Sequence, residues 1–204
     1  RGKSYRSLMI EDFEDMRTLV RAFSGSAIDG LDLSTVKTLV VDLLTDVGEL
    51  CKKEILVKSR PAMTKERTKD ERETPKGIYD DLMTMEDWGL YGTRMSGFIS
   101  ALCHLPVHVI CMCLSSHQEN KKTGEIKRVP GFNGQLAFTC PRFFDLVLSM
   151  EPGVDSDGKP CRAWRTAPTP EVMAKDASGV LDTLEPTNWI SLFKKILNNK
   201  KGAK

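Results

Sequence analysis

No apolar run in this sequence approaches the roughly 20 residues that a membrane-spanning helix needs. The opening residues, "RGKSYRSLMIED", have neither the apolar core of a signal peptide nor an initiator methionine, so we expect a processed chain or a fragment in the cytoplasm. The six cysteines form no C-x-x-C pair, which disfavours a zinc site or a disulfide framework and predicts reduced thiols.

Length and composition predict one soluble domain. The 204 residues are 40% hydrophobic and 28% charged, enough to bury a sizeable core. The net charge of +2 is too small to indicate nucleic-acid binding, so a basic patch would have to come from local clustering. We therefore expect residues 1–204 to form a single domain.

Short apolar segments alternate with segments of helical spacing. The expected strands are 5–10, 34–44, 107–116, 145–153 and 160–169, and the expected helices are 11–25, 45–56, 79–106, 135–144 and 185–204. Because strands alternate with helices, we predict an α/β fold with a mostly parallel sheet covered on both faces.

Three polar segments interrupt this pattern. Residues 58–76 carry seven Lys and Arg, four acids and two Pro, which predicts a charged surface loop or a charged helical excursion. Residues 117–134 contain a Thr-Gly turn and favour a hairpin-like loop. Residues 198–204 form a basic tail. The excess of positive charge in 58–76 could contact DNA, although a solvated loop is the commoner outcome.

Asp42 stands at the end of the most apolar strand, in "TLVVDLLTDVGEL" (38–50). A carboxylate is costly to bury unless it has a partner. Ligands of parallel α/β sheets bind beyond the carboxyl ends of the strands, and Asp42 lies there. Two explanations stay open: it holds a cation, or it caps the helix expected to begin near Thr45.

Three quoted stretches resemble phage-type RecA-like P-loop ATPases, which accompany single-strand annealing and recombination functions. They are "TLVVDLLTDVGEL", residues 86–150 from "EDWGLYG" to "DLVLSM", and "AKDASGVL" (174–181), and the similarity covers roughly residues 6–197. The resemblance implies a three-layer RecA-like core that binds ATP with Mg²⁺ in the cytoplasm of a bacterial host. It also implies a homo-oligomer that works on single-stranded DNA, with a phage annealing or single-strand-binding protein as a further partner.

The resemblance assigns roles to individual residues. Asp42 matches the Walker B aspartate, which holds Mg²⁺ mostly through water. Ser115 or Ser116, expected at the end of the strand 107–116, matches the polar sensor of the γ-phosphate. Thr45, just after the Walker B strand, is expected to line the nucleotide site.

The resemblance also suggests roles for residues in two other parts of the sequence. Lys175 and Asp176, in "AKDASG", match a motif near the edge of the nucleotide or the neighbouring subunit. Glu119 is the candidate within this chain for the acid that activates water, although in this fold that acid can lie upstream. His117 belongs to no legible Ser/His/Asp or Cys/His set and is expected to be structural.

Two departures stand out. The sequence contains no G-x-x-x-x-G-K-[ST], and "GKS" at 2–4 lacks the preceding strand and glycine-rich turn that a phosphate loop needs. We therefore expect that the first strand and the phosphate loop are missing from this chain. Gln135 stands where family members often carry a lysine, which argues against a finger acting across a subunit boundary from this position.

The leading prediction is an ATP-binding protein, a DNA-dependent ATPase when whole. The alternative is a non-catalytic module on the same fold that binds single-stranded DNA or a partner and has lost ATP; the absent phosphate loop favours it. A small-molecule kinase or transferase would need a phosphate loop and a substrate lid, and the sequence indicates neither. Trp88 and Tyr91 are expected in the core rather than as stacking platforms for bases.

Overall fold

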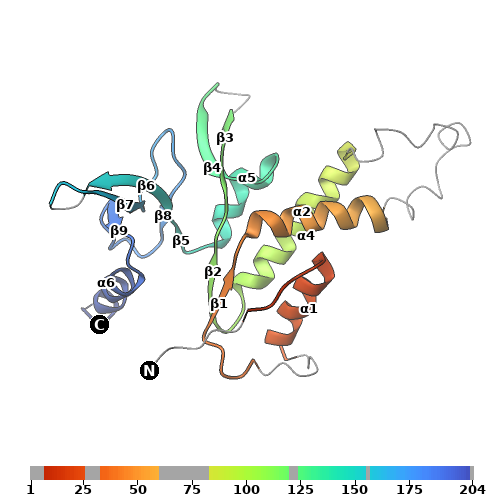
Figure 1. Cartoon of the computed structure of the whole chain (residues 1–204), viewed down its shortest axis with the longest axis horizontal. Helices are drawn as coiled ribbons and strands as arrows, with labels where there is room; N and C mark the ends of the chain where they lie inside the picture. The colour runs from red at the N-terminus through yellow and green to blue at the C-terminus, as the bar shows by residue number, and fades with distance from the viewer. Residues whose placement is uncertain (1–6, 26–32, 60–82, 120–123, 155–156, 203–204) are drawn as a thin grey trace, which may run out of the picture. The chain divides into compact units, whose positions relative to one another are not determined.

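The computed structural model describes residues 7–25, 33–59, 83–119, 124–154 and 157–202 (Figure 1). The chain divides into two compact units, residues 1–114 and 115–204.

The first helix of unit 1, α1 (Phe13–Phe23), begins at a capping box. Asp12 Oδ1 accepts a hydrogen bond from the Asp15 N–H at 2.9 Å, and the Asp15 carboxylate accepts one from the Asp12 N–H at 3.3 Å. This reciprocal pairing satisfies two of the N–H groups that a helix start leaves open. Phe13, Met16 and Val20, which recur at helical spacing, are buried together with Leu19, whereas Phe23 at the end of the helix is half-buried.

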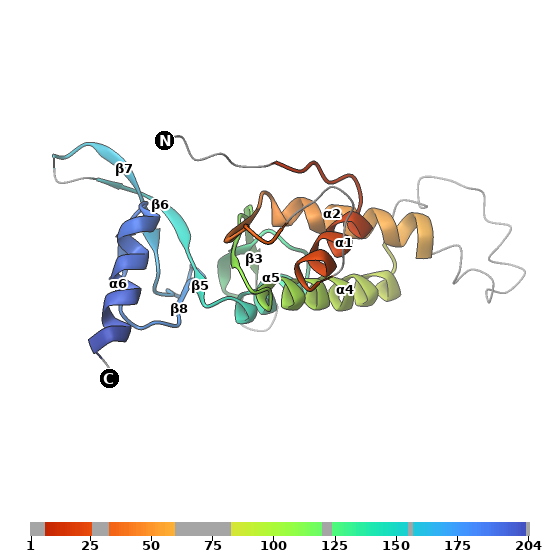
Figure 2. The same cartoon turned by 90° about the horizontal axis from the view of Figure 1, so that it is seen from below.

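Two longer helices pack with α1. They are α2 (Leu44–Glu54), continued by a π-helical turn η1 (Ile55–Ser59), and α4 (Met85–Cys103). Figures 1 and 2 show α1, α2 and α4 side by side. The apolar residues that recur at helical spacing along α4 are all buried: Tyr91, Met95, Phe98, Ile99 and Leu102. The Phe13 ring meets the Phe98 ring with centroids 5.4 Å apart.

A two-stranded parallel sheet completes unit 1. Strands β1 (Thr38–Val41) and β2 (His108–Cys111) pair in register, with Val41 opposite Cys111. Val41 is buried, whereas Val40 points the other way and is exposed. The apolar segments 34–44 and 107–116 therefore do contain strands, each shorter than predicted. Residues 7–10, expected at the end of a strand, form neither helix nor strand.

A buried ion cluster links the three helices. Glu54 of α2, only 8% exposed, accepts hydrogen bonds at Oε1 from Arg17 of α1 at 2.8 Å and Arg94 of α4 at 3.1 Å. Cys51, one turn earlier on α2, is fully buried beside this cluster, and burial raises the pKa of its thiol to about 12.

Unit 2 begins with an antiparallel hairpin of β3 (Ser115–Glu119) and β4 (Ile126–Pro130). The hairpin expected in residues 117–134 is thus confirmed, although its first strand starts earlier. A short helix α5 (Gln135–Thr139) and a 3₁₀ turn η4 (Cys140–Phe143) follow, as predicted for 135–144. The Gln118 side chain donates to the Phe132 carbonyl at 2.6 Å and so ties β3 to the segment after β4.

The rest of unit 2 is built from small antiparallel sheets and one helix. Strand β5 (Leu146–Val147) pairs with β8 (Lys175–Asp176). Strands β6 (Ser149–Val154), β7 (Pro160–Arg165) and β9 (Leu184–Pro186) form a second sheet in the order β6-β7-β9. The predicted edge strand 160–169 is therefore central in its sheet. Helix α6 (Trp189–Gly202) follows, with Trp189 and Trp164 centroids 4.4 Å apart.

The described strands form small sheets, not the one mostly parallel sheet that the sequence predicted. Among named strands in the described residues, only β1 and β2 pair in parallel. The reason is local: the apolar run of 107–116 does not continue as one strand, because the chain leaves β2 after Cys111 and Ser115 opens the β3–β4 hairpin. All six cysteines are free thiols; Cys51 and Cys140 are buried and the other four are half-buried.

Candidate functional site

Asp42 lies one residue beyond β1, at the carboxyl end of the parallel pair. Its side chain is exposed, and within the described residues no hydrogen bond or ion pair engages it. The Asp42–Leu43 peptide bond is cis. The sequence prediction that an aspartate stands at this rim of the sheet is therefore confirmed, and its carboxylate faces solvent.

The helix-capping alternative for Asp42 does not hold. The N-cap position of α2 is occupied by Leu43, and no side chain caps the helix there. Asp42 precedes the cap by one residue and makes no capping hydrogen bond within the described part of the chain. If Asp42 capped the helix, its carboxylate oxygens would accept hydrogen bonds from backbone N–H groups. Because they do not, these oxygens are available to a ligand.

Thr45 anchors the end of β2 to the start of α2. Its Oγ1 accepts a hydrogen bond from the Leu114 N–H at 3.0 Å and lies 3.1 Å from the Cys113 Sγ. Backbone bonds reinforce this link, because the Leu44 N–H donates to the Met112 carbonyl at 2.7 Å. The hydroxyl predicted to line the nucleotide site thus holds the rim on which Asp42 stands.

The polar residues after β2 lie in unit 2. Ser115, Ser116 and Glu119 belong to β3, where Ser116 is half-buried and the other two are exposed. Ser116 Oγ receives a long hydrogen bond of 3.4 Å from Gln118. His117 is exposed and lies opposite Arg128 of β4. Asp42 belongs to unit 1.

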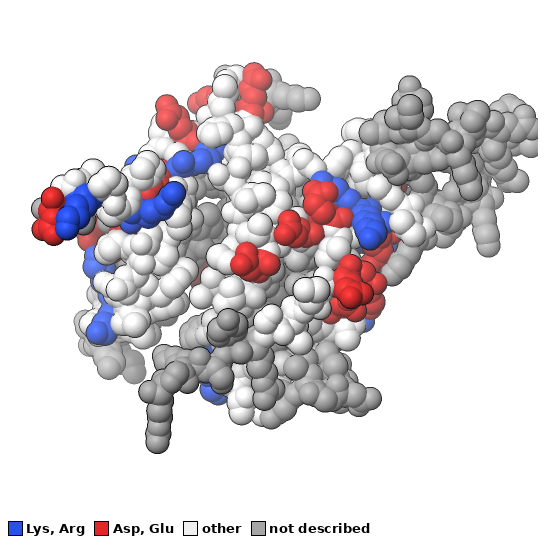
Figure 3. All heavy atoms as spheres, viewed as in Figure 1, with Lys and Arg blue, Asp and Glu red and all other residues white. Residues whose placement is uncertain are grey.

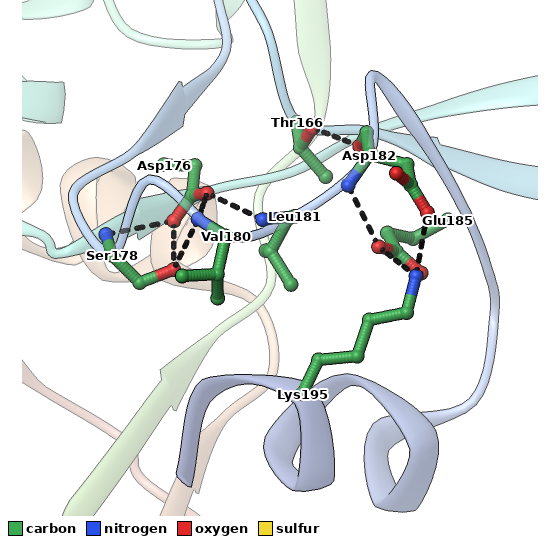
Figure 4. A network of polar contacts seen from close by, with 8 residues as sticks. All are labelled: Thr166, Asp176, Ser178, Val180, Leu181, Asp182, Glu185 and Lys195. Atoms are coloured by element: carbon green, nitrogen blue, oxygen red, sulfur yellow. Dashed lines mark hydrogen bonds and ion pairs between the residues drawn. The ribbon is translucent and has the colours of Figure 1, made fainter. Parts of the chain in front are cut away.

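Asp176 closes a tight turn after β8 (Figure 4). Its carboxylate accepts hydrogen bonds from the N–H groups of Ser178 at 2.8 Å, Val180 at 3.1 Å and Leu181 at 3.0 Å, and from the Ser178 hydroxyl at 2.5 Å. Burial is the largest single influence on the Asp176 pKa and raises it, but the hydrogen bonds from Ser178 and the backbone outweigh burial and leave the pKa below its ordinary value. Lys175 donates to the Phe144 carbonyl at 2.7 Å.

A second network lies beside this turn (Figure 4). Glu185 is 1% exposed and accepts from the Lys195 ammonium at 2.7 and 2.9 Å and from the Asp182 N–H at 2.9 Å. Hydrogen bonds to Asp182 and Glu185 raise the pKa of Lys195. The network fastens α6 to β9 and to the turn, so Lys175, Asp176 and Lys195 all serve contacts within unit 2.

A third carboxylate is shared by two arginines. Glu151 Oε1 accepts from Arg128 at 2.7 Å and from Arg165 at 2.8 Å. The hydrogen bond from Arg165 leads the influences that hold the pKa of Glu151 below its ordinary value. Neither this cluster nor the Arg17–Glu54–Arg94 cluster is predictable from the sequence, because their members lie far apart in sequence and no local pattern connects them.

Other predictions from the sequence concern residues outside these clusters. The charged segment 58–76 lies almost entirely outside the described residues, as does "GKS" at 2–4. Tyr91 is buried in the core as predicted, whereas Trp88 is half-buried and meets the Tyr91 ring edge-on at 5.6 Å. Within the described residues, no group of three or more His, Cys, Asp or Glu side chains could hold a metal ion.

The charged side chains of unit 1 are unevenly spread. In Figure 3, acidic side chains gather over α1 and α2 on the visible face. Asp42, Asp46 and Glu49 are exposed along the start and outer side of α2. Lys52 bonds Glu49 at 2.5 Å and lies over the Trp88 ring at 5.5 Å, so it does not neutralise Asp42.

No helix within the described residues is both long and apolar enough to cross a membrane.

A comparison with protein-family models matches residues 3–178 to the family AAA_24, described as an AAA domain. The match covers unit 1 and most of unit 2, and it ends before β9 and α6. No match was found among curated proteins or among solved structures.

Proposed function

Because this chain belongs to the AAA domain family of P-loop ATPases, we propose that Asp42 is its magnesium-binding aspartate and that the protein binds ATP with Mg²⁺ beyond the carboxyl end of β1. One observation carries the proposal. Asp42 stands at this rim exposed, without a capping role and without an ion pair in the described part of the chain.

The donor set fits Mg²⁺. This ion keeps several of its waters and is commonly bound by one or two carboxylates together with the phosphates of the nucleotide, so a dedicated cage of three protein ligands is not required. A lone exposed carboxylate at the rim of a parallel pair meets that need. When bound, Mg²⁺ neutralises charge on the β- and γ-phosphates.

Residues of unit 1 hold this rim in place. Thr45 fastens Leu114 to the first turn of α2, and Leu44 bonds Met112, so the carboxyl ends of β1 and β2 stay together. The Glu54 cluster fixes α2 against α1 and α4. These contacts hold the backbone on which the exposed Asp42 carboxylate stands.

The remaining site residues are assigned from the resemblance. Ser115 or Ser116 would sense the γ-phosphate, and exposed Glu119 is the candidate for orienting the attacking water. Lys175 and Asp176 keep the β5–β8 region in shape through Phe144 and Ser178. Any effect of this pair on nucleotide therefore passes through the conformation of the turn.

The finer function follows the same resemblance. We assign the protein to the RecA-like, phage recombination class of ATPases, acting as a homo-oligomer on single-stranded DNA alongside an annealing or single-strand-binding protein. The test is ATP hydrolysis with and without single-stranded DNA, on this chain and on a form extended upstream of Arg1. Hydrolysis that DNA accelerates supports the assignment, and hydrolysis indifferent to DNA removes the DNA-dependent part.

One observation favours the second candidate, a non-catalytic DNA- or partner-binding module. The sequence carries no phosphate loop of the form G-x-x-x-x-G-K-[ST]. If this module is the function, single-stranded DNA binds with an affinity that ATP leaves unchanged. Fluorescence anisotropy of a labelled oligonucleotide, with and without ATP and Mg²⁺, separates the two candidates.

A further inference from the structure

Helix α6 has an inner side that is fully used by unit 2. Leu192 is buried, the Trp189 ring packs on Trp164, and Lys195 reaches Glu185. These contacts hold the helix on the β6-β7-β9 sheet.

The outer side of α6 is different. Ile190 is 70% exposed, Leu197 is 58% exposed, and Lys194 between them is exposed. The spacings of four and three residues place all three on one face of the helix. The helix contains four lysines and no acid. This outer face of α6 (Ile190, Lys194, Leu197) joins apolar surface to positive charge, and it lies beyond the residues that the family model matches.

Two classes of occupant fit this face poorly. Single-stranded nucleic acid would use lysine and stacking aromatics, but the outer face itself has no aromatic residue, and the neighbouring Trp189, 38% exposed, already contacts Trp164 at 4.4 Å and Phe193 at 5.8 Å. A membrane surface needs a broad apolar face, whereas on this face a lysine separates the two aliphatic side chains. Two aliphatic side chains around one lysine match a protein surface that pairs aliphatics with acids.

The chain itself carries such a surface. Residues 7–15, "SLMIEDFED", hold four acids and no basic residue. Leu8 is 52% exposed and Met9 is 90% exposed, and Glu11 beside them is exposed. The capping box accounts for Asp12 and Asp15 but not for the exposure of Leu8 and Met9. Apolar patches with such a charged border are typical of protein-binding surfaces.

We infer that the outer face of α6 in one copy of this protein docks on residues 7–15 of a second copy, with Lys194 facing Glu11 and with Ile190 and Leu197 covering Leu8 and Met9. The two surfaces differ, so the contact is heterologous and runs head to tail, which builds rings or filaments. The inference rests on the proposed association of copies and not on nucleotide binding.

Charge reversal in analytical ultracentrifugation tests this contact on the whole chain. Wild-type protein self-associates, and added salt weakens the association. Lys194→Glu and Glu11→Lys each weaken it about tenfold, because reversal replaces an attraction by a repulsion. Lys53→Glu, which makes the same charge change on an exposed residue of α2, leaves association unchanged. Leu197→Ser weakens association without any charge change.

Mixing the two reversed variants gives the sharpest outcome. In an equimolar mixture of Lys194→Glu and Glu11→Lys, the reversed α6 matches the reversed acidic segment and the two unreversed surfaces match each other, so self-association is restored with the two variants alternating. Wild-type protein that stays monomeric, a Lys53→Glu effect equal to that of Lys194→Glu, or a mixture that stays monomeric overturns the inference. ATP binding by calorimetry on Lys194→Glu is expected to equal wild type, so failed docking and failed nucleotide binding are separate results.

Discussion

Replacing Glu54 by glutamine should destabilise the helical layer of unit 1 far more than a surface substitution would. The change keeps the shape of the side chain and removes its charge. It leaves the guanidinium group of Arg94, 3.1 Å from Glu54 Oε1, facing a neutral acceptor, and it leaves Arg17, 2.8 Å from the same oxygen, with Glu14 as its remaining anionic partner. The glutamine oxygen can occupy the Oε1 position, so the expected cost comes from the lost negative charge inside the cluster.

The expected cost follows from burial. Breaking a buried ion pair by removing one partner costs about 3–5 kcal/mol. The Glu54 side chain is 7% exposed, but those of Arg17 and Arg94 are 32% and 25% exposed and can recover part of their hydration. We therefore expect about 2–3 kcal/mol, which for a chain of 204 residues lowers the melting temperature by roughly 5–10 °C.

Thermal and urea unfolding of the purified chain measure this loss, with Glu49→Gln as the matched control. Glu49 lies on the same helix and pairs with Lys52, but its side chain is 62% exposed, so its replacement should cost about 1 kcal/mol or less. Equal losses for Glu54→Gln and Glu49→Gln would refute the reasoning, because the buried carboxylate would then contribute no more than a surface one.

Three further outcomes are expected. Thr45→Val should lower stability by about 1–2 kcal/mol in urea unfolding because the Leu114 N–H loses its acceptor, and Thr45→Ser should restore it; equal losses would count against the anchor. The pKa of Asp176 is lowered in the folded state, so the stabilisation by its carboxylate is present above the ordinary pKa of 3.8 and is lost as the pH falls through the lowered pKa. Asp176→Asn should therefore reduce the loss of stability at acidic pH. A variant whose stability falls with pH as steeply as that of the wild type would contradict this. Cys51, with its pKa at about 12, should resist alkylation at pH 8 until the protein unfolds, and labelling of the native protein at the rate of a free thiol would show that it is not buried.

Helical faces were the most predictable part of the fold. The face of α4 from Tyr91 to Leu102 recurs at helical spacing, and burial of such a face depends mainly on that spacing. The C-terminal helix and the hairpin around residues 117–134 were predictable for similar reasons, because turn residues and hydrophobic periodicity are local features of the sequence.

Strand pairing was not predictable in the same way. The apolar run from Val107 to Leu114 gives no sign that the strand ends at Cys111, because apolar content does not reveal which strand will pair next. Ser115 instead pairs opposite Pro130 in an antiparallel hairpin. The ion clusters around Glu54 and Glu151 were likewise hidden, because their partners meet only in the folded chain.

The candidate site was predictable at one position. The Walker B-like pattern placed Asp42 at the carboxyl end of β1, and the structure agrees. The roles of Thr45 and Asp176 could not be read in advance, because each depends on backbone N–H groups brought close by folding. A pattern names the residue types at a site, whereas their hydrogen-bond partners decide which of them stay available to a ligand.

Calorimetric titration of ATP, with and without Mg²⁺, tests the central claim most directly. The proteins are this chain, its form extended upstream of Arg1, and the variants Asp42→Asn and Asp46→Asn in each. We predict that Mg²⁺ tightens ATP binding. Asp42→Asn should weaken ATP binding in the presence of Mg²⁺ by about tenfold or more. Asp46→Asn, one turn further along on exposed surface, should bind ATP with Mg²⁺ as tightly as the wild type. ATP binding by neither form, or an Asp42→Asn variant with the full Mg²⁺ gain, would contradict the account.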